Sequence, residues 1–352
     1  MKKGWKMVPM GKLCTIKNGK SNTEDAKEDG AYAFFDRSKK IKRSSRYLYD
    51  CEALIIPGEG AEFLPRHFIG KFDLHQRAYA LFDFSKSINV MFLFYYLTYF
   101  KDYFTRVAVG ATVKSLRLRH FEQLPVPVPP LSEQQRIVSI LDKVFSALAI
   151  AKTSTTKNLQ NAVTLFEARL QTVFIQRTGW NSLPFEECIE SVKYTTRVKR
   201  KEFLEKGKYP IVSQEADLIN GYWDDTADIF KVIKPVVIFG DHTKVLKFVD
   251  FDFVLGADGV KILLPKRILD SKFFFYNLRS IQLKTLGYSR HYRLLKELHV
   301  NFPDISEQLR IAKDLEILEQ GIRRIAILYE HKLAVLEELK KSLLHQAFSG
   351  GL

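Results

Sequence analysis

The feature that most constrains this chain is a segment that occurs twice. Residues 131–137 read Leu-Ser-Glu-Gln-Gln-Arg-Ile, and residues 305–311 read Ile-Ser-Glu-Gln-Leu-Arg-Ile. The shift between them is 174 residues, and a Gly-Trp pair recurs at nearly the same shift, at residues 4–5 and 179–180. Several anchors in one order and at nearly one offset predict two copies of a single structural unit.

Length and composition fit two globular units. A chain of 352 residues is longer than a single hydrophobic core supports, and its 46% hydrophobic content excludes a mainly disordered protein. No apolar run approaches the ~20 residues that a membrane span needs, so we expect a cytoplasmic protein. Cys14, Cys51 and Cys188 are odd in number and form no CxxC pair, which predicts buried thiols and neither disulfides nor a metal site.

Each copy of the repeated segment opens a pattern typical of a long helix. Ser132 with Gln135 three residues on has the form of a capping box. Apolar residues follow in steps of three and four as far as residue 174, and the second pattern runs from Ser306 to the Gly-Gly pair at 350–351. At about 1.5 Å per residue, each helix should be roughly 60 Å long.

Such a helix, with one narrow apolar stripe, is stable only against a partner, and the repeat supplies one. We therefore predict a coiled coil of the two helices. An antiparallel pairing, which we favour, places the intervening domains at opposite ends, whereas a parallel pairing would place them side by side. The residues expected to pair the helices and to dock partner proteins are Ile137, Leu141, Leu148, Phe166, Leu170, Ile311, Leu315, Ile322, Leu336 and Leu343.

The segments between the helices predict mixed α/β domains. Short β-type runs bounded by turn residues recur in both halves, and a more helical, aromatic segment follows them at residues 90–104 and 271–286. The β-type runs lie at residues 53–58, 79–82, 236–241 and 260–265. In chain order the expected parts are a globular domain at 1–131, a long helix at 132–178, a globular domain at 179–305 and a long helix at 306–352.

The charge of the chain fits a polyanionic partner. Its net charge is +15, from 55 Lys and Arg against 40 Asp and Glu. Residues 1–131 carry 22 basic and 13 acidic side chains, whereas residues 306–352 carry seven of each. Basic side chains that displace condensed counterions supply most of the non-specific affinity for nucleic acid, although a merely solvated basic surface is the alternative.

These residues resemble the specificity subunit of type I restriction-modification systems over essentially the whole chain. The resemblance rests on the repeated run at residues 129–137 and 303–311, and on the closing Leu-Leu-His-Gln-Ala-Phe-Ser-Gly at 343–350. Segments similar to those of target-recognition domains lie at residues 72–79, 240–243 and 256–261.

The resemblance implies a protein with no catalysis and no cofactor of its own. In this family two target-recognition domains, here residues 1–131 and 179–305, each read one half of a bipartite double-stranded DNA site, and the paired helices set the gap. Two methyltransferase subunits dock on the helical region and methylate adenine with S-adenosylmethionine, and motor-nuclease subunits can join them in host defence. Asp304 stands where the first repeat has Pro130, so we expect the second helix entrance to lose a rigid residue.

Other interpretations remain open. The chain could serve a related system with a fused methyltransferase-nuclease, or it could be a coiled-coil adaptor that joins proteins without DNA. An enzyme acting alone is not favoured, because the sequence has no Walker A motif, Gly-rich dinucleotide loop or Asn-Pro-Pro-aromatic motif. Glu338 and Lys340 match the tail of a nuclease motif but would not share a helix face. His242 beside Asp241 fits a loop histidine near phosphate better than acid–base catalysis.

The candidates for DNA contact are basic and amide side chains in predicted loops. Arginine pairs bidentately with guanine and glutamine with adenine, while lysine more often holds phosphate. The preferred base-reading or backbone-clamping loop is Ser289–Arg293, which combines forked donors with an aromatic ring. The candidates are Lys39, Lys40, Lys42, Arg43, Arg46, Arg77, Arg106, Lys114, Arg117 and Arg119 in the first domain, and Arg197, Lys199, Arg200, Lys201, Gln214, His242, Lys244, Arg290, His291 and Arg293 in the second.

One aromatic group has two interpretations. Tyr95, Tyr96, Tyr99 and Phe100 lie close together at helical spacing. We expect them in the hydrophobic core, and a platform for stacking bases is the alternative.

Overall fold

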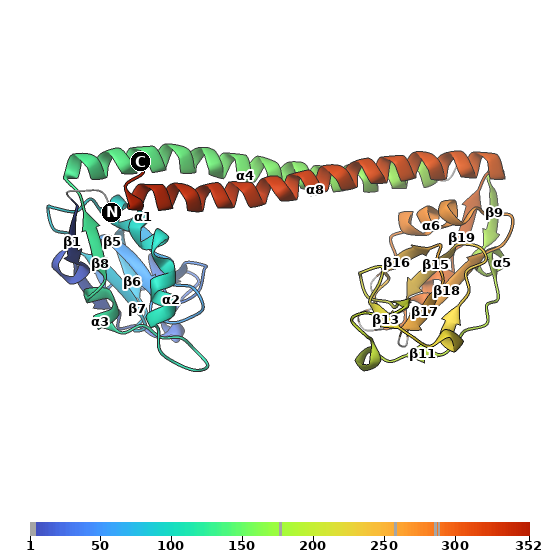
Figure 1. The fold of residues 1–352 in the computed structure, drawn as a ribbon, viewed down its shortest axis with the longest axis horizontal. Helices are drawn as coiled ribbons and strands as arrows, with labels where there is room; N and C mark the ends of the chain where they lie inside the picture. The colour runs from blue at the N-terminus through green and yellow to red at the C-terminus, as the bar shows by residue number, and fades with distance from the viewer. Residues whose placement is uncertain (1–4, 176–177, 257–258, 285–286, 288) are drawn as a thin grey trace. The chain divides into compact units, whose positions relative to one another are not determined.

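The computed structural model of the chain describes residues 5–175, 178–256, 259–284, 287 and 289–352. The chain divides into two compact units. Unit 1 consists of Met1–Thr155 and His331–Leu352, and unit 2 consists of Thr156–Glu330. The boundary falls inside both long helices, so each unit contains one globular domain and a part of each helix (Figure 1).

The two long helices are α4 (Leu131–Phe174) and α8 (Ile305–Ser349). Both begin one residue earlier than the sequence pattern predicts, and the predicted cap at Ser132 is wrong. Ser132 lies inside the first turn, because the carbonyl oxygen of Pro130 accepts bonds from the backbone N–H groups of Glu133 and Gln134 at 2.9 and 3.1 Å. Pro130, and not Ser132, therefore stands at the entrance of the first helix.

The entrance of α8 has Asp304 where the entrance of α4 has Pro130. Asp304 takes the capping position, and its Oδ1 accepts the backbone N–H of Glu307 at 3.0 Å. At the other end the predicted stop is confirmed: Gly350 has φ +88°, and Gly351 N donates to Gln346 O at 2.8 Å. Local capping chemistry therefore fixes both ends of α8.

The predicted antiparallel pairing of the helices is confirmed within each unit. In unit 1, Ile137 near the start of α4 packs in one buried cluster with Leu344 and Phe348 near the end of α8. In unit 2, Leu170 near the end of α4 packs with Ile311 near the start of α8. Of the predicted pairing residues, those buried are Ile137, Leu141, Phe166, Leu170, Ile311 and Leu315, and those half-buried are Leu148, Ile322, Leu336 and Leu343.

The globular domain of unit 1 is built on a six-stranded sheet in the order β2-β7-β5-β6-β3-β4. Its strands are antiparallel except for the β3 and β6 pair. Their bounds are β2 Thr15–Asn18, β3 Tyr32–Phe35, β4 Lys42–Ser44, β5 Tyr49–Pro57, β6 Arg66–Leu74 and β7 Ala78–Phe82. The helices α1 Val90–Tyr99, α2 Lys101–Val107 and α3 Leu118–Glu122 follow, and short 3-10 turns span Met10–Lys12 and Thr23–Asp25.

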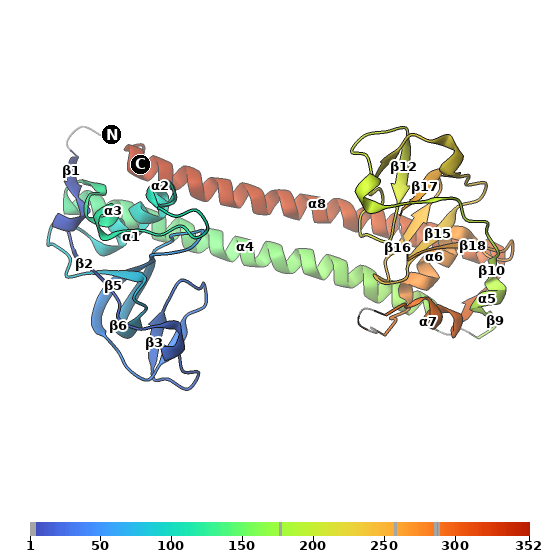
Figure 2. The same cartoon turned by 90° about the horizontal axis from the view of Figure 1, so that it is seen from below.

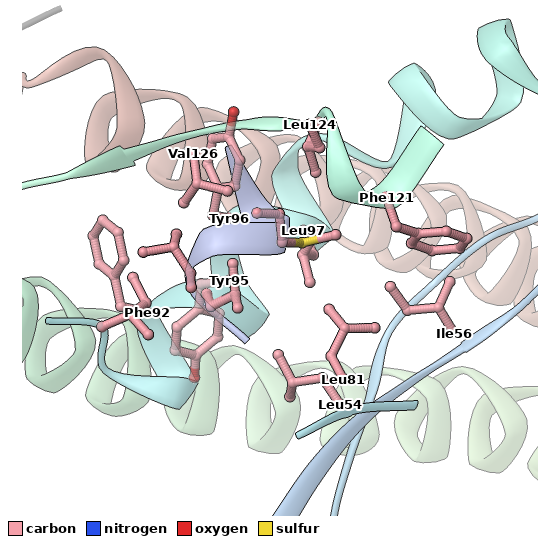
Figure 3. Packing of buried hydrophobic residues seen from close by; sticks show 14 of the residues in the cluster. Leu54, Ile56, Leu81, Phe92, Tyr95, Tyr96, Leu97, Phe121, Leu124 and Val126 are labelled. Atoms are coloured by element: carbon pink, nitrogen blue, oxygen red, sulfur yellow. The ribbon is translucent and has the colours of Figure 1, made fainter. Parts of the chain in front are cut away.

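The core of unit 1 lies between α1, the sheet and the long helices. Figure 3 shows side chains of α1, among them Phe92, Tyr96 and Leu97, in one cluster with Leu54 of β5 and Leu81 of β7. The ring of Phe348 in α8 lies 5.3 Å from the rings of both Phe92 and Tyr96. The aromatic group is therefore core, as expected, and not a base-stacking platform: Tyr95 and Tyr96 are buried, while Tyr99 and Phe100 pack against the same cluster.

In its described residues, the globular domain of unit 2 contains two larger sheets besides a two-stranded ribbon. One has the order β10-β18-β15-β16 and is antiparallel, with α6 lying along one face (Figure 2); the other has the order β11-β17-β12-β13, and β14 also pairs with β17. Phe273 and Tyr276 of α6 pack in one cluster with the long-helix residues. The bounds are α5 Phe185–Cys188, β10 Ile189–Glu190, β11 Arg197–Val198, β12 Tyr209–Val212, β13 Gly221–Trp223, β14 Ile229–Phe230, β15 Val236–Gly240, β16 Leu246–Val249, β17 Phe253–Gly256, β18 Val260–Pro265, α6 Ser271–Ser280 and α7 Tyr292–Lys296, with 3-10 turns at Arg200–Glu202 and Thr226–Asp228.

The internal repeat extends to the strands that lead into the long helices. β8 (Pro125–Val128) precedes α4 and pairs antiparallel with β1 (Lys6–Pro9). β19 (His299–Phe302) precedes α8 and pairs antiparallel with β9 (Asn181–Pro184). Each long helix thus follows one strand of a two-stranded ribbon. The other strand of that ribbon lies at the start of the same repeat.

Cys14 and Cys188 are buried, and Cys51 is half-buried. Burial raises the pKa of the Cys14 thiol to about 12 and that of Cys188 to about 11, which keeps both protonated. In the described part of the chain, no helix combines the length and the apolar character that a membrane span requires. Among the same residues, no group of His, Cys, Asp and Glu side chains could hold a metal ion.

Candidate nucleic-acid interface

A buried glutamine of the repeated segment fastens the globular domain of unit 1 to α4. Gln134 Oε1 accepts the backbone N–H of Asn89 at 2.8 Å, and Gln134 Nε2 donates to the carbonyl oxygens of Ser87 and Pro129 at 2.9 and 2.8 Å. Asn89 is the N-cap of α1, since its side chain accepts the backbone N–H of Phe92. Gln134 therefore joins the starts of two helices to each other.

Gln308 makes the same three bonds in unit 2. Its Oε1 accepts the backbone N–H of Asp270 at 2.9 Å, and its Nε2 donates to the carbonyl oxygens of Ile268 and Pro303, both at 2.9 Å. Asp270 is the N-cap of α6 and accepts from Phe273 N. Both glutamines are fully buried. The repeated Ser-Glu-Gln sequence thus sets how each long helix sits on its domain.

A polar groove lies on unit 1 where the loops after several strands meet. Two surface hollows of about 320 and 330 Å³ adjoin and share Glu59, Gln76 and Arg77 in their lining. Burial lowers the pKa of His75, which lines the first hollow, and so favours its neutral form. A neutral imidazole fits its Nδ1 as acceptor of the Arg77 backbone N–H at 3.1 Å. The groove therefore presents forked and amide donors beside a carboxylate.

A second carboxylate, buried beneath these loops, holds them together. Asp73 at the end of β6 accepts from the hydroxyls of Ser21 at 2.7 Å and Ser44 at 2.9 Å. Arg46 lies 3.6 Å from the same carboxylate and 3.0 Å from Asp25. Arg46 therefore helps to fix the loop at residues 21–25. Its side chain is also exposed, so it remains accessible to a ligand.

In unit 2 the Ser289–Arg293 run is anchored to the end of β15. Asp241, which follows β15, is 2% exposed, and its Oδ1 accepts the backbone N–H of Tyr292 at 2.7 Å. Its carbonyl oxygen accepts the backbone N–H of His291 at 2.7 Å. Arg290 and Arg293 remain exposed on either side of this anchor. The run thus offers two basic side chains from a backbone that is fixed in place.

A buried lysine closes a neighbouring loop of unit 2. Lys247 of β16 donates from Nζ to the carbonyl oxygen of Asp217 and, at 2.9 Å, to Oδ1 of Asn220. The same Oδ1 accepts the backbone N–H and the hydroxyl of Ser213, both at 2.9 Å. Burial lowers the pKa of Lys247 to about 8, against the opposing effect of Glu215 and Asp217. The loop that carries Gln214 therefore depends on one titratable group.

The family model of the type I restriction modification DNA specificity domain matches residues 2–161 and again residues 178–338. The chain belongs to this family. Two curated relatives are the specificity subunit of the type I restriction enzyme EcoDI from Escherichia coli, 28% identical over 148 residues, and a putative type I restriction enzyme specificity subunit from Haemophilus influenzae, 31% identical over 100 residues. These matches cover 42% and 27% of this chain, but only 33% and 25% of the relatives.

Two solved structures share the fold of this chain. One comes from a study of complex assembly and conformational transition of the type I restriction-modification system. Its alignment with this chain covers 100% of this chain and 99% of the solved chain, with TM-score 0.75 and 17% identity. The HsdS subunit from Thermoanaerobacter tengcongensis covers 100% and 98%, with TM-score 0.53 and 15% identity. At these identities the likeness concerns the fold.

In the first specificity domain the predicted contact residues fall into two groups and two outliers. Lys39, Lys40, Lys42, Arg43 and Arg46 lie in β4 or beside it, and all except the half-buried Lys42 are exposed. Arg77 and Arg117 line the groove, and Lys114 lies beside it, its carbonyl oxygen accepting Gly60 N. Arg106 and Arg119 lie apart, on α2 and α3.

In the second specificity domain most predicted residues are exposed, but His291 is not. Arg197, Lys199, Arg200 and Lys201 lie on and after β11, with Arg200 paired to Glu215 at 3.0 Å. Gln214, His242 and Lys244 are half-buried near the loop anchor, where Gln214 Oε1 accepts His242 N at 3.2 Å. His291 is 1% exposed, so its choice as a DNA contact is corrected: it supports the loop from inside.

Several residues of the interface were missed by sequence reasoning. Glu59 gains its importance from Arg77, further along the chain, and no local pattern marks it. Asp73 and Gln76 lie in the segment 72–79 that resembles target-recognition domains, but their partners Ser21 and Asn22 are distant in sequence. Gln134 and Gln308 could have been found, because they recur within the repeated segment. The Glu338–Lys340 stretch lies within α8, as expected from its apolar spacing.

Proposed function

We propose that this chain is the DNA sequence-specificity subunit of a type I restriction-modification complex. The observation that carries the proposal is the double match to one DNA specificity domain within a single chain. Two domains with unlike loops fit a bipartite target whose halves differ. The net charge of +15 supports a polyanionic ligand, since basic residues supply the sequence-independent part of DNA affinity.

The proposed division of labour follows the chain. Residues 1–131 and 179–305 are the two target-recognition domains, and residues 132–178 and 306–352 are the spacer helices. The exposed basic residues of each domain contact one half-site, with Arg77 and Arg117 in the first domain and Arg290 and Arg293 in the second as the best-supported contacts.

The proposed partners supply all the chemistry. Two methyltransferase subunits dock on the helical region and methylate adenine, and motor-nuclease subunits join them when the complex restricts DNA. A DNA substrate and these partners imply a cytoplasmic location. Exposed apolar side chains on the long helices, including Ile150, Leu165 and Leu328, support docking there.

The test uses the full chain reconstituted with its methyltransferase subunits on a library of split DNA sites. We expect methylation of one asymmetric bipartite sequence. We expect the double change Arg290→Ala and Arg293→Ala to relax or abolish selection in the second half-site and to leave the first half-site unchanged, because the two domains read separately. Methylation without any split preference would contradict the function, and an unaltered second half-site would contradict the assignment of the loop.

A further inference from the structure

We propose that the groove of unit 1 is a base-reading site, in which Arg77 reads a guanine of the first half-site and Glu59 holds Arg77 in the reading position. The inference rests on the proposed DNA-specificity function and assigns a role to two residues of one domain. The ligand is the major-groove edge of a G·C pair, which offers the N7 and O6 acceptors that a forked donor can bond together.

The side chain of Arg77 is both exposed and oriented. Its Nη1 donates to Glu59 Oε1 at 2.6 Å, while the side chain remains 61% exposed. A guanidinium has five N–H donors in a planar fork, so one bond to Glu59 fixes the plane and leaves donors for a ligand. Glu59 itself is only 13% exposed and also accepts the hydroxyl of Ser115 at 3.1 Å. The pair is therefore supported from beneath.

The backbone at Arg77 is held as firmly as its side chain. Gly58 N donates to the Arg77 carbonyl oxygen at 2.7 Å, and Arg77 N donates to His75 Nδ1 at 3.1 Å. A side-chain carbon at Gly58 would lie 2.5 Å from that same carbonyl oxygen, which accounts for a glycine there. A recognition side chain gains specificity when the backbone and its neighbours fix it in advance.

The neighbours of Arg77 fit the reading of a duplex. Gln76 donates from Nε2 to Asn22 Oδ1 at 2.5 Å, which places an amide beside the guanidinium. Arg117 lines the adjoining hollow. Adjacent forked and amide donors can address neighbouring base pairs, and Arg117 can neutralise a phosphate.

Unit 2 also has an acidic residue that bonds a basic loop, although there the carboxylate anchors the loop backbone and not an arginine side chain. Glu59 follows β5 by two residues and bonds the loop just before α3, through Ser115. Asp241 follows β15 directly and bonds the start of α7, through Tyr292 N. In both repeats an acidic residue after a buried strand thus fixes a basic loop.

The experiment compares variants of the full chain, reconstituted with its methyltransferase subunits, on a library with a randomised first half-site. We expect Arg77→Ala to lower discrimination at one guanine position about 5- to 150-fold and to leave the second half-site unchanged. Glu59→Ala should relax the same position, and Glu59→Gln should restore much of it, because an amide oxygen still accepts from Arg77.

Glu62→Ala is the matched control, since it breaks an exposed ion pair with Lys39 (3.0 Å) in the same domain and should change no base preference. Urea unfolding of each variant, compared with that of the wild-type chain, reports whether the domain of unit 1 is folded. Unchanged first half-site preferences in Arg77→Ala would overturn the proposal, and so would an equal loss on every first half-site, which indicates a phosphate contact. If the wild-type chain itself selects no split target, the proposed function fails. The further inference then fails with it.

Discussion

At the residue scale, Lys247 makes part of unit 2 sensitive to pH. Its folded-state pKa is lowered to about 8 by burial, from the ordinary 10.5 of the unfolded chain. Between these pH values the unfolded chain holds more protons than the folded one, so the free energy of unfolding rises with pH. Relative to the unfolded chain, the folded loop thus disfavours the charged form of Lys247.

We therefore predict that the Lys247→Met variant shows a smaller rise in unfolding free energy between pH 7.5 and pH 9.5 than the wild-type chain does. Urea unfolding followed by tryptophan fluorescence measures it. The control is Lys231→Met, which removes an exposed lysine paired with Asp252 and should keep the rise. The same pH dependence in wild type and Lys247→Met would refute the role of this lysine.

At the scale of the elements, the buried glutamines explain why Ser-Glu-Gln occurs twice. Gln134 and Gln308 each bond the N-cap of a domain helix and a proline carbonyl that precedes a long helix. Further ties run between the same elements: the Tyr95 hydroxyl donates to Asp142, and the Tyr276 hydroxyl donates to Glu319 at 2.7 Å. Domain and helix are thus joined at more than one point in each unit.

We predict that Gln134→Leu lowers the unfolding free energy of unit 1 by about 2 to 4 kcal/mol, because it leaves buried backbone groups without a partner. The control is built into the chain. Gln135 is exposed, and the second repeat has Leu309 at that position, so Gln135→Leu should stay within about 0.5 kcal/mol of wild type. Equal effects of the two changes in urea unfolding would show that the buried bonds are dispensable.

How much of this could be predicted from sequence depended on the range of the interactions. The long helices were placed to within one residue at their starts, because prolines, glycines and apolar spacing act locally. The cap was misassigned, because Pro130 and Asp304 take the role expected of serines. His291 looked like a reader of DNA, but its burial depends on Asp241, which lies fifty residues away.

At the scale of the whole molecule, we propose that one chain carries two different DNA readers whose separation is set by its helices. Unit 1 and unit 2 share the ribbon, the glutamine bonds and the loop anchor, yet they differ in their sheets. Shared supports with unlike surfaces fit a split, asymmetric target. A change in the helices alone should then alter the gap and nothing else.

The most direct measurement is a genome-wide map of methylated adenine in cells with the wild-type chain, without it, and with one extra heptad after both Thr155 and Glu330. A heptad keeps the helix pairing in phase and adds about 10 Å, roughly three base pairs. We predict one bipartite motif that disappears without the chain and returns in the heptad variant with the same half-sites and a longer gap. A map that is the same in all three cells would contradict the account.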